Sequence, residues 1–130
     1  MTIALWCLFI AGLLHFISKT PLSIAQAKSK GGYDNNNPRD QQAALTGWGK
    51  RALALHQNQI ESFPFFAAGV MVATVTGLES PAIGFLSVMY VVARFFYMFC
   101  YLKDLATLRS LVWIAGFASS LALMCSPAWA

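Results

Sequence analysis

Charged side chains are scarce in this chain. Only 11% of its 130 residues are Asp, Glu, Lys or Arg, and only 5 of these are acidic. A water-soluble domain of this length needs a more highly charged surface, so the composition excludes an ordinary soluble protein. Hydrophobic residues instead make up 58% of the chain. The sequence predicts one all-α integral membrane domain over residues 1–130.

Motifs typical of common catalytic and metal sites are also missing. Cys7, Cys100 and Cys125 all fall in apolar segments, and their spacings match no metal-binding motif. The sequence contains no Ser-His-Asp set, glycine-rich phosphate loop or internal repeat. We interpret the cysteines as small hydrophobic packing residues, and we expect neither a bound metal nor a nucleic-acid partner.

Four apolar stretches are present, and they predict helices at about residues 3–24, 44–76, 81–102 and 105–128. A membrane crossing needs about 20 apolar residues, so we expect a four-helix transmembrane bundle. Pro21 predicts that the first helix bends or ends there. Ser80 is predicted to cap the third helix, with Pro81 at its first position. The hydrophilic residues 28–42 are expected to form a solvated loop.

The basic residues lie in particular connections. Lys28, Lys30 and Arg39 lie in the first connection, and Lys103 and Arg109 lie at the third. The second connection, residues 76–80, has neither lysine nor arginine. The positive-inside rule therefore predicts a multi-pass protein whose first and third connections are cytoplasmic and whose termini are on the other side.

Two of the predicted helices each carry a stripe of polar side chains on one face. At helical spacing, the stripes are formed by Arg51, Asn58 and Glu61 in the second helix and by Arg94, Tyr97 and Tyr101 in the third. Ionisable groups within a membrane are costly and usually face the bundle interior or a cavity.

Two interpretations of these stripes remain open. Glu61 and Arg94 could neutralise each other and hold the bundle together, which would be a purely structural role. The amount of polarity favours a ligand site, since one ion pair does not require Asn58 and several tyrosines as well. His15 and His56 have no catalytic partners in the sequence, and we interpret both as structural.

Residues 51–64 resemble the second-helix signature of the MAPEG family, the membrane-associated proteins of eicosanoid and glutathione metabolism. That signature has an arginine, then Asn-x-x-Glu, then Phe-Pro, and here Arg51, Asn58, Glu61 and Phe63-Pro64 match it. Residues 93–101 look like the family's third-helix pattern, and residues 108–110 resemble the start of its fourth helix. The loop at residues 31–39 is similar to the bacterial branch, which implies a bacterial inner membrane.

The resemblance implies a homotrimer of four-helix subunits that uses glutathione as a cosubstrate against a lipophilic small molecule within membrane lipids. The implied reaction is that of a transferase or peroxidase. Arg109 is the implied catalytic residue that stabilises the thiolate. The implied glutathione-binding residues are Arg51, Asn58, Glu61, Arg94, Tyr97 and Tyr101.

The chain departs from the family pattern at two contact positions. Ala54 stands where well-characterised members have an arginine, and Ser62 stands where they have an aromatic residue. An alternative is therefore a non-catalytic membrane scaffold or lipid-binding subunit that keeps the fold. A small transporter is a third hypothesis, but four spans without an inverted repeat are evidence against it.

Overall fold

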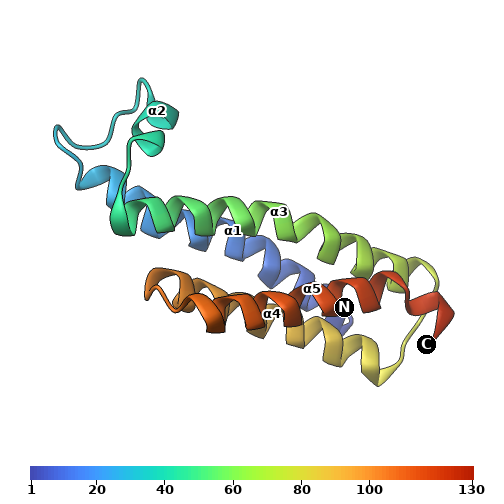
Figure 1. Cartoon of the computed structure of the whole chain (residues 1–130). Coiled ribbons are helices and arrows are strands. Elements are labelled where there is room, and N and C mark those ends of the chain that lie inside the picture. Colours follow the sequence, from blue (N-terminus) through green and yellow to red (C-terminus); the bar gives the residue numbers. More distant parts are fainter.

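Four long helices form the body of the protein in the computed structural model, which describes all 130 residues (Figure 1). A short helix precedes the second long one, and a 3₁₀ turn follows the last. In chain order the elements are α1 (Ile3–Ala27), α2 (Pro38–Ala43), α3 (Gly47–Val75), α4 (Pro81–Leu102), α5 (Ala106–Met124) and η1 (Ser126–Ala128). There is no β-strand, so the predicted all-α class is confirmed.

Capping side chains set where two of the long helices begin. The Thr2 hydroxyl accepts a hydrogen bond from the Leu5 backbone N–H at the start of α1. The Ser80 hydroxyl accepts one from the Ala82 N–H, and Pro81 occupies the first turn of α4, as the sequence predicted. Each cap satisfies a donor that a helix start leaves without an intrahelical partner.

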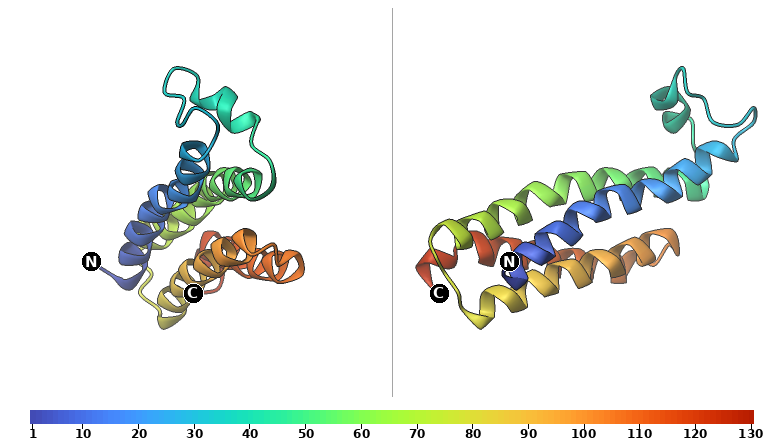
Figure 2. Two further views of the ribbon diagram at one scale, coloured as in Figure 1. Left: turned by 90° about the vertical axis from the view of Figure 1, so that its left-hand side faces the viewer. Right: turned by 180° about the vertical axis from the view of Figure 1, so that it is seen from behind.

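The long helices lie side by side with α3 in contact with each of the other three (Figure 2). Both termini and the α3–α4 connection lie at one end of the bundle, which we call the terminal end (Figure 1). The segment containing α2 and the α4–α5 connection lie at the other end, which we call the loop end. The predicted polar stripes therefore lie closer to the loop end.

Three of the four long helices, α1, α4 and α5, are long and apolar enough to cross a membrane. The sequence predicted a fourth crossing within α3, which is the longest helix, with 29 residues. Its first half is polar and contains Lys50, Arg51 and Glu61. This polarity lowers the mean hydropathy of α3. Asn58 and Gln59, in the same half, form hydrogen bonds with Arg94 of α4.

The sequence predicted that the first helix bends or ends near Pro21. Helix α1 does not end there, because it continues to Ala27 with Pro21 inside it. A proline removes only one intrahelical hydrogen bond, and neighbouring helices in membrane proteins compensate for that loss. One contact of α1 with α3 lies near Pro21, where the Ser18 hydroxyl is 2.9 Å from His56 Nδ1.

The segment predicted as a loop contains α2 and is held by glutamine side chains. The Gln26 amide donates to the Pro38 carbonyl (3.2 Å), and the Gln41 amide donates to the Gly32 carbonyl (2.8 Å). The Gln41 side-chain oxygen accepts the Asp34 backbone N–H (3.0 Å). After this segment α3 begins at Gly47, three residues after the predicted start at residue 44.

Small side chains allow the helices to approach closely. The core contains Ala4, Cys7 and Ala11 of α1 against Phe66 of α3 and Tyr90 of α4. The Phe66 and Tyr90 rings stack with centroids 3.8 Å apart. Close packing of small residues is the main source of stability between membrane helices, because lipid is as apolar as the helix surfaces.

The cysteines form no disulfide. Cys7 and Cys100 are buried, and Cys125 is exposed. The two buried thiols act as small packing groups, as the sequence indicated.

Replacing Gly69 with alanine should destabilise the bundle by about 1–3 kcal/mol, the usual cost of overpacking. A methyl group there would lie 2.7 Å from the Leu123 side chain and 3.1 Å from the Ser120 carbonyl oxygen, so α3 and α5 would have to separate. The measurement is the thermal unfolding midpoint in detergent. Gly12→Ala is the control, because a methyl group at Gly12 meets no atom within 4 Å. Equal midpoints for the two variants would contradict the predicted close contact.

Candidate functional site

A buried arginine joins α3 to α4 near the loop end. Arg94 is only 1% exposed. Its Nε donates to the Gln59 side-chain oxygen (2.9 Å), and its Nη2 donates to the Asn58 side-chain oxygen (3.0 Å). Its guanidinium also lies 4.2 Å from the centre of the Tyr97 ring. These contacts fix the orientation of Asn58 on the surface of α3.

The ion pair between Glu61 and Arg94, which the structural interpretation of the stripes requires, is not formed. Arg94 is occupied by the amide side chains of Asn58 and Gln59, and no ion pair or hydrogen bond involves the Glu61 carboxylate. Glu61 is exposed and lies about one helical turn beyond Asn58. An exposed carboxylate without a partner in the bundle is available to a cationic group from outside the chain.

Arg109 lies in a pocket between α4 and α5. The pocket has a volume of about 410 Å³ and is lined by Tyr97, Tyr101, Arg109, Ser110, Trp113 and Ile114. The Arg109 guanidinium lies 4.5 Å from the centre of the Tyr101 ring, and the Tyr97 and Tyr101 rings meet edge to face at 5.5 Å. No protein acceptor takes a hydrogen bond from the Arg109 side chain, so its N–H groups are free for a ligand.

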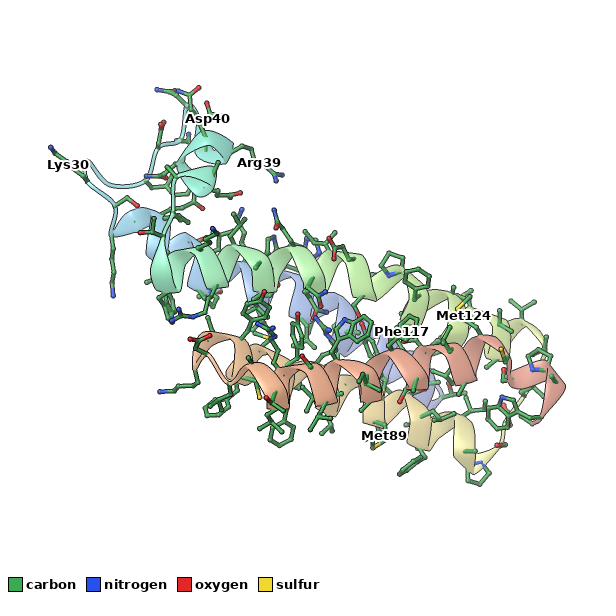
Figure 3. The ribbon with its side chains drawn as sticks, viewed as in Figure 1. Lys30, Arg39, Asp40, Met89, Phe117 and Met124 are labelled. Atoms are coloured by element: carbon green, nitrogen blue, oxygen red, sulfur yellow. The ribbon has the colours of Figure 1, made fainter.

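A second pocket of about 210 Å³ lies between α3 and α5, and it contains Asn58, Glu61 and Ser62. Trp113 lines both pockets. The Trp113 ring stacks on Phe117 (5.1 Å, 8° between planes), and Phe117 meets Phe65 of α3 edge to face. Figure 3 labels Phe117 on the side of α5 that faces α3. The two pockets are thus neighbours separated by an aromatic wall.

The seven predicted site residues lie in four different places. Tyr97, Tyr101 and Arg109 share the larger pocket, and Asn58 and Glu61 share the smaller one. Arg94 lies buried behind them, where it positions Asn58. Arg51 lines neither pocket, and its buried Nε has no hydrogen-bond partner.

Two residues of the site were missed by the sequence analysis. Gln59 is fully buried and receives the Arg94 Nε–H. Trp113 forms the wall between the pockets. Gln59 belongs to a polar run, any member of which could have contacted Arg94. Trp113 lies one helical turn from Arg109, and this spacing is the one sequence feature that relates it to the site.

Both histidines lie away from these pockets, between α1 and α3. His56 Nδ1 is 2.9 Å from the Ser18 hydroxyl, a buried contact that supports its structural interpretation. The His15 ring packs edge to face against His56 at 5.4 Å. No group of three or more His, Cys, Asp or Glu residues is close enough together to hold a metal ion.

Comparison with known proteins gives one match. The model of the MAPEG family matches residues 3–129, which is nearly the whole chain. Neither the curated proteins nor the solved structures that were compared give a match. The family match agrees with the helical architecture and with the membrane-compatible helices described above. The chain therefore belongs to the MAPEG family and is a membrane protein of that all-α class.

Proposed function

We propose that this protein is a glutathione-dependent transferase or peroxidase that acts on lipophilic electrophiles. The observation that supports this most is the pocket in which the Arg109 guanidinium lies over Tyr101 with its N–H groups free. A guanidinium there is a fixed positive charge beside a cavity that opens toward the lipid-facing side chains of α5. This is the environment that a thiolate nucleophile requires.

The residues around the two pockets suit the chemistry of glutathione. The unpaired Glu61 carboxylate is a partner for the amino group of the tripeptide, and Asn58 offers an amide held in place by Arg94. The Tyr97 and Tyr101 hydroxyls are donors for its peptide carbonyls or carboxylates. Arg51 lies outside both pockets of one chain, which fits a site completed by a neighbouring subunit of a homotrimer.

Arg109 would act by favouring the ionised thiol. A free thiol has a pKa of about 8.5, so it is mostly protonated at neutral pH. An arginine stays charged under all physiological conditions and favours the thiolate, and each unit by which the thiol pKa falls is worth about 1.4 kcal/mol. The proton leaves to solvent at the loop end.

The electrophile would come from the membrane to the aromatic wall of Trp113 and Phe117. In transfer, the thiolate sulfur forms a bond to an electrophilic carbon, and the leaving group departs with the displaced electron pair. In peroxide reduction, the thiolate sulfur bonds to one peroxide oxygen, the O–O bond breaks, and the other oxygen leaves as the alcohol after protonation. A second glutathione thiol then attacks the oxidised sulfur, which yields the disulfide and water.

The orientation in the membrane follows the positive-inside rule in this proposal. Lys30 and Arg39, labelled in Figure 3, lie in the segment around α2 at the loop end, and the α4–α5 connection with Lys103 lies at the same end. This end would face the cytoplasm of a bacterial cell, where glutathione is available to the site.

The direct test is the ultraviolet absorbance of the glutathione thiolate during titration of the purified, detergent-solubilised protein at neutral pH. A saturable thiolate signal is expected. Its absence from folded, assembled protein would rule out the proposed thiol activation.

The second candidate, a non-catalytic scaffold, is favoured by the Arg94–Gln59–Asn58 network, which stabilises the bundle without any ligand. That candidate predicts no thiolate signal and no thiol-dependent turnover.

The Glu61→Gln variant should raise the KM for glutathione about two- to fivefold with little change in kcat, because an exposed ion pair contributes to binding alike in the ground and transition states. Steady-state kinetics measures this change. The matched control is a glutathione analogue that lacks the amino group. It should bind equally well to the wild type and to the variant. A loss that is the same for both ligands would contradict the pairing of Glu61 with the amine.

A further inference from the structure

A pocket larger than either pocket of the candidate site lies at the terminal end, away from Arg109 and Glu61. It has a volume of about 650 Å³, within the range of about 300–1,000 Å³ typical of small-molecule sites. Its walls come from the first turn of α1, the end of α3, the α3–α4 connection and the first two turns of α4. None of its lining residues belongs to either pocket of the candidate site.

The lining changes from polar to apolar along α4. Thr2, Glu79 and Ser80 lie where the helices begin. The ends of membrane-spanning helices are expected at the membrane boundary. Phe85 and Val88 line the part that follows, and Val88 is seven residues from Pro81, which is about 10 Å along the helix. Phe85 is 64% exposed and Val88 44%, so this part is continuous with the surface that faces lipid tails. A pocket graded in this way suits an amphiphile whose head group lies at the boundary.

The charge at the polar end selects the head group. Glu79 is the only ionisable side chain that lines the pocket, and no ion pair or hydrogen bond engages its carboxylate. The chain has no lysine or arginine in the first 18 residues, in residues 52–93 or after Arg109, so none lies in the segments that form this end. The Met1 amino group, next to Thr2, is also at this end, but it forms no ion pair with Glu79. An unpaired carboxylate attracts an ammonium group and repels an anionic head group.

We propose that this pocket binds one phospholipid whose head group carries a primary ammonium, of the phosphatidylethanolamine class. The ammonium pairs with Glu79, and one acyl chain lies along Ile83, Phe85 and Val88. The bound lipid fills the space between the start of α1 and the start of α4. This site is separate from the proposed glutathione site and does not depend on it.

Native mass spectrometry of the detergent-solubilised protein with three phospholipids of identical acyl chains tests the proposal. Phosphatidylethanolamine should be retained about two- to fivefold more than phosphatidylcholine, the range that an exposed ion pair supplies, and phosphatidylglycerol should be retained least. Glu79→Gln should abolish the preference. Asp104→Asn removes a carboxylate at the loop end and should leave the preference unchanged. A preference that survives Glu79→Gln, or strongest retention of phosphatidylglycerol, would overturn the proposal.

A second variant tests the place of the acyl chain. Gly84 lines the pocket, and the atoms nearest to a Cβ there belong to the Ile3 side chain, at 3.6 Å or more, which is ordinary contact. Gly84→Leu should therefore place its side chain in pocket space. It should lower retention of all three lipids, whereas Gly12→Leu, which lies in open space outside the pocket, should not. In the wild type, phosphatidylethanolamine with a photoreactive acyl chain should label residues 83–88. Labelling confined to other segments would refute this location, even if Gly84→Leu failed to fold.

Discussion

Replacing Arg109 with alanine should abolish the thiolate absorbance of bound glutathione and reduce kcat for conjugation by at least about a hundredfold. A hundredfold corresponds to about 2.7 kcal/mol of lost transition-state stabilisation, the lower end of what removal of one preorganised electrostatic donor costs an enzyme. The effect should be large because Arg109 is the only cation that lines either pocket of the site. The measurements are thiolate absorbance and steady-state turnover with a lipophilic electrophile.

The packing around Arg109 makes this test specific. Its guanidinium is partly exposed and rests on Tyr101, and its side chain forms no hydrogen bond within the protein. Arg109→Ala should therefore change the unfolding midpoint very little. Arg109→Lys keeps the charge but loses the planar stacking, so it should retain part of the thiolate signal. Full thiolate formation in folded Arg109→Ala protein would show that another group activates the thiol.

Hydropathy and capping predicted most of the fold. The α4 bounds follow from Ser80-Pro81 at one end and a short polar connection after Leu102 at the other. The helix α2 was not predictable in this way, because a six-residue helix in a polar segment has no hydrophobic period. Its position depends on hydrogen bonds from Gln26 and Gln41, which are distant in sequence from their partners. Pro21 did not end α1, because a single proline removes only one intrahelical hydrogen bond and membrane helices tolerate that loss.

The candidate site was predicted in part, because helical spacing gives faces but not the register between helices. Arg94 and Tyr97 do lie against each other, as their spacing indicated. Whether Arg94 contacts Glu61 or Gln59 depends on the axial register of α3 relative to α4. The periodicity of polar residues within either helix does not determine that register. Trp113 was missed for a different reason, since an aromatic residue in an apolar helix is equally typical of a surface that faces lipid.

Replacing Arg94 with alanine should lower the free energy of unfolding by about 2–4 kcal/mol. Hydrogen bonds between membrane helices average only about 0.6 kcal/mol, but this residue differs from that average in three respects. It donates to two side chains, it packs on the Tyr97 ring, and it is almost completely buried. Its removal leaves the Gln59 oxygen without a partner, in a side chain whose amide nitrogen already has none.

Denaturant titration in mixed micelles would measure this loss, and two further variants would assign its cause. Arg94→Met keeps most of the volume, so its cost reports the hydrogen bonds and the charge. Phe95→Ala removes a large side chain from the neighbouring position, which is 48% exposed, and it should cost less than about 1 kcal/mol. Wild-type stability in Arg94→Met would mean that the network does not hold α3 to α4.

The same residue should also affect glutathione binding, through Asn58. If Arg94 acts only by holding the Asn58 side chain, then Arg94→Met and Asn58→Ala should each raise the KM for glutathione. The double variant should be no worse than Asn58→Ala alone, because residues that share one network are not additive. Additive effects would instead mean that Arg94 contacts the ligand itself, and that the buried guanidinium becomes accessible when glutathione binds.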